Sequence, residues 1–143
     1  MGSGLFIAFE IIKKYNEVRG KVILLKSKLG LKDYKLNFNG FYFTTDSNFI
    51  YSPQPFYILQ DDINNSRLSE GFLEGKLLSL DGISDIKGII SDTTINFSGS
   101  NKNLKHYYEG EKSNGIDCLK WDYTGAIRIG DKRGGFSIKR NYK

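Results

Sequence analysis

The stretch 105-KHYYEGEKSNGIDCLKWDYTGAIRI-129 carries the strongest indication of the fold. In its second half, Leu119, Trp121 and Tyr123, and then Ile127 and Ile129, place apolar residues on one face, which is the period of a β-strand that packs one face inward. Between the halves lies Asn114-Gly115, a pair that accepts positive φ at both central positions of a tight turn. The stretch therefore predicts a hairpin in which Lys105–Glu111 folds back against Ile116–Tyr123.

Strand-like runs of the same kind extend outward from this stretch, from residue 34 to the C-terminus, and Gly, Asn, Asp and Ser separate them. Asp81-Gly82 marks a second tight turn, and Asp131–Gly134 a slightly longer loop between the last two strands. No helical pattern lies between the runs, which argues against a parallel sheet. We expect a mostly β chain, an antiparallel meander that forms a small barrel or sandwich. The expected strands are Lys35–Thr44, Phe56–Gln60, Gly71–Leu80, Asp85–Ile90, Thr93–Ser98, Lys105–Glu111, Ile116–Tyr123, Gly125–Ile129 and Gly135–Arg140.

Residues 5–29 show a different period, with apolar residues at three- and four-residue steps. This spacing predicts one N-terminal amphipathic α-helix ahead of the β-rich part, residues 34–143. Gly20 is unfavourable inside a helix, so Lys21–Leu25 is open to the alternative of a strand. The chain of 143 residues suits a single domain around one core, residues 1–143.

Cys118 is the only cysteine of the sequence, so the chain cannot form an internal disulfide or a thiolate metal cluster. We expect a reducing compartment, the cytoplasm, and the apolar segment near the N-terminus lacks the basic region of a signal peptide. Met1–Gly4 resembles a cloning remnant, however, which suggests that natural sequence was removed before Leu5. A membrane helix in the removed part would make the domain membrane-associated. The lysines that follow Ile12 suit the cytoplasmic flank of such a helix.

The segments Gly88–Phe97, Tyr108–Gly110 and Asp117–Trp121 resemble the recurring strand pattern of small bacterial lipocalin-like β-barrels. This resemblance implies a barrel that binds a small ligand, without assigning its ligand residues. The last segment, Tyr123–Arg140, is similar to the closing strands of the β-barrel effectors of bacterial antiphage systems. Those effectors follow two membrane helices and respond to a cyclic nucleotide, so this second resemblance implies a nucleotide-sensing barrel held at a membrane.

Two groups of residues have the types needed for catalysis. Asp61-Asp62 with Glu74-Gly75-Lys76 has the outline of a metal-dependent nuclease, in which carboxylates hold a divalent ion and a lysine steadies the phosphate. His106 and Cys118 would be neighbours across the expected hairpin, as a nucleophilic pair requires. Acids and lysines on a strand usually form a solvated face, and a lone strand cysteine is usually a core residue. We therefore expect no enzyme, no metal site and no cofactor.

Cations and aromatic residues are interleaved near the C-terminus, where residues 101–143 contain ten Lys and Arg against five acids. Stacking on bases and neutralising phosphates require such a mixture. Residues 1–40 are basic as well, but residues 41–100 are acidic, so a continuous basic face forms only if the two ends meet. The candidate ligand-binding residues are Tyr42, Tyr57, Tyr108, Trp121, Tyr123, Arg128, Arg133 and Arg140.

The function that we expect is that of a non-catalytic β-barrel module that binds a small ligand or a protein partner. The first alternative is a cyclic-nucleotide-sensing barrel of a bacterial antiphage effector, and the second is a metal-dependent nuclease. The N-terminal helix would either plug one end of the barrel or lead to the upstream membrane anchor.

Overall fold

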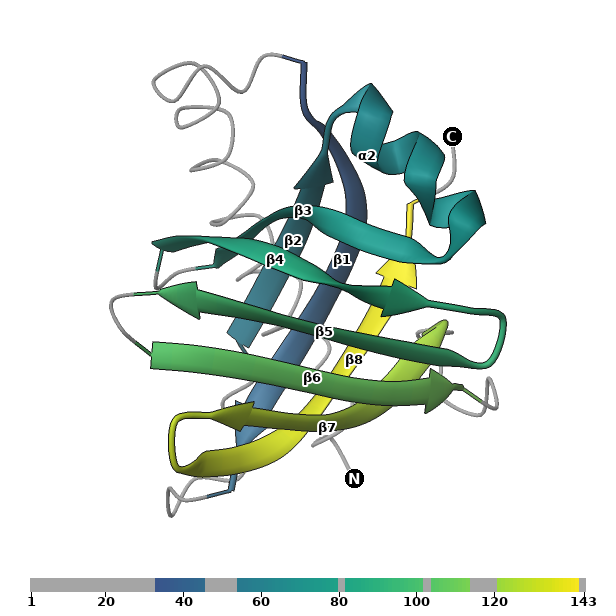
Figure 1. The fold of residues 1–143 in the computed structure, drawn as a ribbon. Helices are drawn as coiled ribbons and strands as arrows, with labels where there is room; N and C mark the ends of the chain where they lie inside the picture. Colours follow the sequence, from purple (N-terminus) through teal and green to yellow (C-terminus); the bar gives the residue numbers. More distant parts are fainter. Residues whose placement is uncertain (1–32, 46–53, 80–81, 102–103, 114–120, 142–143) are drawn as a thin grey trace, which may run out of the picture.

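The structure is a computed structural model that describes residues 33–45, 54–79, 82–101, 104–113 and 121–141. Its strands form a closed antiparallel barrel in which the spatial order equals the sequence order (Figure 1). The expectation of a mostly β antiparallel meander is confirmed, and the meander closes as a barrel rather than as a sandwich. The strands are β1 Lys35–Thr44, β2 Gln54–Gln60, β3 Phe72–Ser79, β4 Gly82–Ile90, β5 Thr94–Asn101, β6 Leu104–Lys112, β7 Tyr123–Ile129 and β8 Lys132–Arg140.

Pairing between the last strand and the first closes the barrel. β8 runs antiparallel to β1, with Thr44 opposite Gly134. Closure satisfies the backbone donors and acceptors that the two edges of an open sheet would expose. Glycines make the close approach possible, because a Cβ at Gly134 would collide with the carbonyl oxygen of Phe43, and one at Gly40 with that of Ser137.

A short helical segment lies between β2 and β3, where the sequence pattern indicated no helix. The helix α2 spans Asp62–Ser66 and continues as the 3-10 turn η1, Arg67–Glu70. The side chain of Asp61 caps its start by accepting a backbone N–H at 2.8 Å, and Gly71, with a φ of 92°, ends it. Only Leu68 in this segment is buried, so no apolar stripe marks the helix in the sequence.

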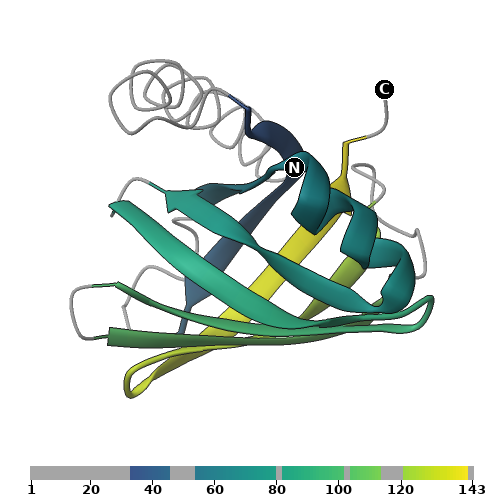
Figure 2. The same cartoon turned by 45° about the horizontal axis from the view of Figure 1, so that its top comes forward.

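The helical segment covers one end of the barrel (Figures 1 and 2). The buried amide of Gln60 connects the strands there, because it donates to the carbonyl oxygen of Glu74 at 2.7 Å and accepts from Asn37 Nδ2 at 3.0 Å. Asn37 Nδ2 also lies 3.2 Å from Oδ1 of Asn65 on α2. The expected helix of residues 5–29, with its expected role as a plug, lies outside the described residues.

The partner of β6 differs from the predicted one. β6 pairs with β7, so that Glu111 lies opposite Thr124 and Lys112 opposite Tyr123. The prediction that Lys105–Glu111 pairs with Ile116–Tyr123 is therefore wrong, although the Asn114-Gly115 pair itself lies outside the described residues. The observed register places Ile127 and Ile129 on the core side, beside Tyr108, and this burial outweighs a local turn preference.

The two other predicted turns lie one to three residues from their observed positions. Ile129 pairs with Lys132, so the last hairpin turns at Gly130-Asp131 and β8 begins inside the predicted loop. Gly130 has the positive φ, 58°, that such a turn requires. Ser79 pairs with Gly82, so Gly82 belongs to β4 rather than to the predicted turn.

Aromatic rings fill the centre of the barrel. Phe97 and Tyr108 are stacked, with ring centroids 4.2 Å apart and an angle of 11° between the rings. Phe136 meets the Tyr108 ring edge-on at 5.4 Å, and Phe56 lies 6.0 Å from the same ring. An eight-stranded barrel has an interior that side chains just fill, and this cluster occupies its middle.

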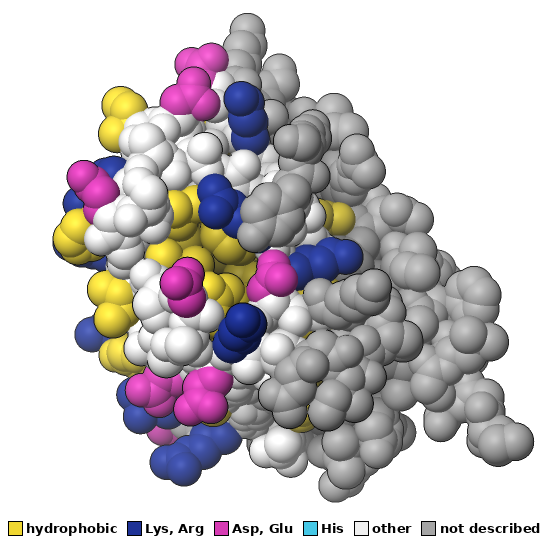
Figure 3. All heavy atoms as spheres, turned by 90° about the vertical axis from the view of Figure 1, so that its right-hand side faces the viewer, with side chains coloured by type: hydrophobic (Ala, Val, Ile, Leu, Met, Phe, Trp, Pro, Cys, Tyr) yellow, Lys and Arg dark blue, Asp and Glu magenta, His cyan; other side chains and the backbone are white. Residues whose placement is uncertain are grey.

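The core is not covered equally on all sides. On the face of Figure 3, hydrophobic side chains lie in a hollow that Lys, Arg, Asp and Glu side chains surround. Ile90 and Tyr123 are hydrophobic residues that pack against the core while only partly buried. Within the described residues, no helix has the length and apolar composition needed to cross a membrane.

Tyr107 and Tyr108 provide a matched test of the barrel register, because they are adjacent and point to opposite faces. Tyr108→Ala should lower the free energy of unfolding by about 3–5 kcal/mol, since it removes a ring that is 2% exposed. Tyr107→Ala should cost less than about 1 kcal/mol, because Tyr107 is 40% exposed. Urea unfolding of both variants measures the difference. A register shifted by one residue would reverse the order of the two effects.

Candidate functional site

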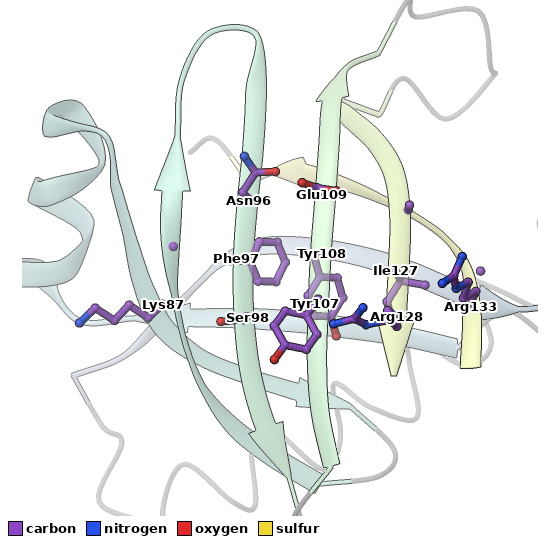
Figure 4. Close-up of a pocket in the computed structure, with 13 residues that line it drawn as sticks. Lys87, Asn96, Phe97, Ser98, Tyr107, Tyr108, Glu109, Ile127, Arg128 and Arg133 are labelled. Atoms are coloured by element: carbon purple, nitrogen blue, oxygen red, sulfur yellow. The ribbon is translucent and has the colours of Figure 1, made fainter. Parts of the chain in front are cut away.

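A groove of about 740 Å³ crosses the outer face of strands β4 to β8 (Figure 4). Its floor follows residues that lie opposite one another in successive strands: Phe97 opposite Tyr108, and Tyr108 opposite Ile127. Gly88 and Gly134 continue this floor at its two ends. The side chains of Phe97, Tyr108 and Ile127 are buried in the core, so they present mainly backbone to the groove.

One wall of the groove, named here the basic row, is formed by the next line of residues across the sheet. Each residue of the row lies directly opposite the next one in the neighbouring strand. Successive residues of a strand point to opposite faces, so these side chains point outward where the floor residues point inward. Figure 4 shows them side by side across the strands. In strand order, the basic row consists of Lys87, Ser98, Tyr107, Arg128 and Arg133.

The opposite wall carries polar, small and acidic side chains. Asn96 lies opposite Glu109, and Glu109 opposite Ala126, on the other side of the floor from the basic row. Glu111 follows Glu109 by two residues and therefore shares its outer face, while Lys105 extends the basic side of the same strand. The basic row thus faces a wall whose described lining includes one acid, Glu109.

None of the ion pairs within the described residues includes Lys87, Arg128 or Arg133, although Lys87 lies opposite Glu74 in β3. The guanidinium carbon of Arg128 lies 4.6 Å from the centre of the Tyr107 ring, as in a cation–π contact. Arg133 lies directly opposite Arg128 in the neighbouring strand. Like charges in such positions repel, so a bound anion would relieve an unfavourable arrangement.

Three of the sequence-predicted binding residues line this groove. Tyr108 belongs to the floor, and Arg128 and Arg133 belong to the basic row. Tyr42 and Tyr123 lie on the core side of the sheet instead. Tyr42 is buried in the core, and the hydroxyl of Tyr123 donates to a backbone carbonyl oxygen at 2.6 Å.

The remaining three predicted residues lie in other parts of the barrel. Tyr57 is buried in a second apolar cluster, which contains Leu59 from the same strand. Trp121 is buried too, and its ring meets that of Phe41 edge-on at 5.2 Å. Arg140 is half-buried near the helical end, where its guanidinium lies 3.4 Å from a side-chain oxygen of α2. The structure does not bring these residues into the groove.

Most of the groove residues escape detection in the sequence. Strand alternation alone indicates that Tyr107 points away from Tyr108, and this signal could have identified Tyr107 as the exposed ring. Lys87, Asn96 and Glu109 are ordinary surface residues of three separate strands, with no motif around them. Only the register between those strands brings them to one groove.

The residues proposed for a nuclease are engaged in other interactions. The Glu74 carboxylate lies 3.2 Å from Arg67, and the Lys76 ammonium 2.5 Å from Asp85. Asp61 caps α2. In the part of the chain that the structure describes, no group of three His, Cys, Asp or Glu side chains is placed to hold a metal ion.

The histidine considered for a nucleophilic pair lies on the core side of the sheet. His106 is half-buried opposite Ile129, and its Nδ1 lies 3.4 Å from the hydroxyl oxygen of Tyr108. Cys118, its expected partner, lies outside the described residues. The predicted hairpin was the reason to expect Cys118 beside His106. Because β6 pairs with β5 on one side and with β7 on the other, this reason no longer holds.

Comparisons with protein families and curated proteins identify no relative of this chain. No protein-family model matches the chain, and no curated protein matches it significantly. The structure supports the coarser part of the first resemblance, because an eight-stranded antiparallel barrel in sequential order is also the architecture of lipocalin-like proteins. A shared architecture carries no ligand or activity with it.

Charge-reversing substitutions of Arg133 and Lys87 test the electrostatics of the basic row. Arg133→Glu should raise the free energy of unfolding by about 0.2–1 kcal/mol, because it replaces repulsion from Arg128 with attraction. Lys87→Glu should lower it by a similar amount, because it places a second carboxylate opposite Glu74. Thermal unfolding at low and high salt measures both effects, which should shrink as salt screens them. Equal shifts in the same direction would contradict the assignment of unpaired cations to this row.

Proposed function

We propose that the protein is a non-catalytic binding module that holds an anionic ligand in the outer groove of its barrel. The observation on which this proposal rests is the set of three cations along one wall, Lys87, Arg128 and Arg133, none of which belongs to an ion pair among the described residues. Maintaining like charges side by side destabilises the sheet. Functional sites often retain such unfavourable arrangements because their ligand compensates them.

The groove residues supply binding groups rather than a catalytic arrangement. Cations attract the anion, the Tyr107 ring offers an apolar surface, and Asn96 and Ser98 offer hydrogen bonds. Among the described residues, Glu109 is the only acid of this lining, which contains no histidine or cysteine.

The outer groove is favoured over the barrel interior as the ligand site. A lipocalin-like module would hold its ligand inside, but the stacked Phe97 and Tyr108 rings and Phe136 occupy the middle of this barrel. The groove, in contrast, lies open to solvent on the outer face. Ligand binding in it requires no rearrangement of the core.

A cyclic-nucleotide sensor is the second candidate, and the contact between Tyr107 and Arg128 favours it. A ring held against a guanidinium group offers a surface for a planar base, and the neighbouring cations suit its phosphate. In this form the module would be the sensing barrel of a bacterial antiphage effector, held at the membrane through sequence upstream of residue 1. Its ligand would use the same groove.

Ligand-induced stabilisation tests the proposed function. Purified protein is heated with a panel of mononucleotides, cyclic nucleotides, polyphosphate, an acidic peptide, short oligonucleotides and fatty acids. At least one anion should raise the melting temperature, because a ligand that binds only the folded state stabilises it. The triple variant Lys87→Gln, Arg128→Gln, Arg133→Gln should lose that shift and weaken binding by about tenfold or more.

Lys35→Gln is the matched control for loss of one positive charge. Lys35 lies near Asp62 at the helical end, and its side chain is 75% exposed, so its replacement should change neither stability nor binding. The proposal fails if no anion shifts the melting temperature, or if the triple variant binds as tightly as the parent. A fatty acid that binds both proteins equally would place the ligand site inside the barrel instead.

A further inference from the structure

The basic row is longer than a single nucleotide. From Lys87 on β4 to Arg133 on β8 it crosses neighbouring strands at four successive pairings. Strands lie about 4.8 Å apart, so the row extends over about 19 Å. A stacked strand rises by about 3.4 Å per nucleotide and an unstacked one is more extended, so the row spans at most about five or six nucleotides. Arg128 and Arg133, in adjacent strands, suit neighbouring phosphates, whereas Lys87, three pairings away from Arg128, suits a phosphate farther along the chain.

Tyr107 lies in the middle of this row with one side of its ring accessible. The guanidinium of Arg128 covers the ring from the β7 side, at 4.6 Å. The neighbour on the β5 side is Ser98, whose side chain is too small to cover an aromatic ring. Tyr107 is 40% exposed, so a planar base has room to stack there.

The two walls of the groove would orient such a chain. Phosphates are attracted to Lys87, Arg128 and Arg133, and they are repelled by the Glu109 carboxylate across the floor. Apart from the base that stacks on Tyr107, the bases would then point toward Asn96 and Glu109. An amide and a carboxylate accept hydrogen bonds from the amino groups of bases, and the amide also donates to their ring nitrogens and carbonyl oxygens.

We propose that the groove binds single-stranded nucleic acid of at most about five or six nucleotides, laid across strands β4 to β8 with one base stacked on Tyr107. This inference rests on the anion-binding function proposed above and assigns the class of its ligand. A duplex fits the groove less well, because it carries phosphates on both of its strands and would bring one set toward Glu109. An acidic peptide would satisfy the cations but leave the Tyr107 ring without a planar partner.

Fluorescence anisotropy with labelled six-nucleotide strands tests the proposal. RNA and DNA homopolymers are compared with a duplex of equal length, with AMP and with an acidic peptide as competitors. The single strands should bind more tightly than the duplex and outcompete AMP. Contacts to three cations should make the logarithm of affinity fall with the logarithm of salt concentration at a slope of about −2. A 2′-hydroxyl contact would appear as tighter binding of RNA.

Substitutions separate stacking from phosphate contact. Tyr107→Ala should weaken binding by about 5- to 100-fold without changing the salt slope, and Tyr107→Phe should restore it, because phenylalanine stacks as tyrosine does. Lys87→Gln should reduce the magnitude of the slope by about 0.7, whereas Lys35→Gln should leave slope and affinity unchanged.

The outcomes distinguish this inference from the proposed function. Equal binding by Tyr107→Ala and the parent, or a preference for duplex, overturns the inference about single strands. Binding of AMP or the acidic peptide that depends on the basic row, without tighter binding of oligonucleotides, also overturns it but leaves the anion-binding module intact. Absence of binding by every anion overturns both.

Discussion

The pairing of β8 with β1 is the constraint on which the rest of the structure depends. It converts a meander with two exposed edges into a barrel whose strands are all paired. The pairing requires glycine where the backbones approach most closely, at Gly40 and Gly134, because a side chain at either position would collide with a carbonyl oxygen of the neighbouring strand. Closure with eight strands leaves an interior that side chains can fill or that can hold one small ligand, and in this barrel aromatic rings occupy its middle.

The filled middle of the barrel is the reason for placing the proposed ligand site on the outer surface. Once Phe97, Tyr108 and Phe136 fill the centre, their outward-pointing neighbours are the residues available to solvent. The antiparallel register aligns those neighbours into straight rows across the strands. The basic row and the opposite wall with Glu109 result from this alignment, and the groove between them is floored by the backbone of core residues.

The fold class could be predicted because strand alternation and turn residues are local properties of the sequence. The expected strand Lys35–Thr44 coincides with β1, and most of the other strands differ only at their ends. The hairpin assigned from Asn114-Gly115 was placed wrongly, because a turn preference of two residues is small compared with the burial of Ile127 beside the core rings. The short helix α2 was missed because one buried side chain, Leu68, produces no periodic pattern.

The antiparallel β architecture and the excess of cations near the C-terminus could be predicted from the sequence alone, since alternation and composition need no knowledge of neighbours in space. The sequence also indicates Arg128 and Arg133 as candidate binding residues. Only the tertiary structure decided that Lys87 from β4 joins them and that Tyr107, rather than the buried Tyr108, is the exposed ring. The physical reason is that register between strands depends on burial summed over the whole barrel, which no local segment encodes.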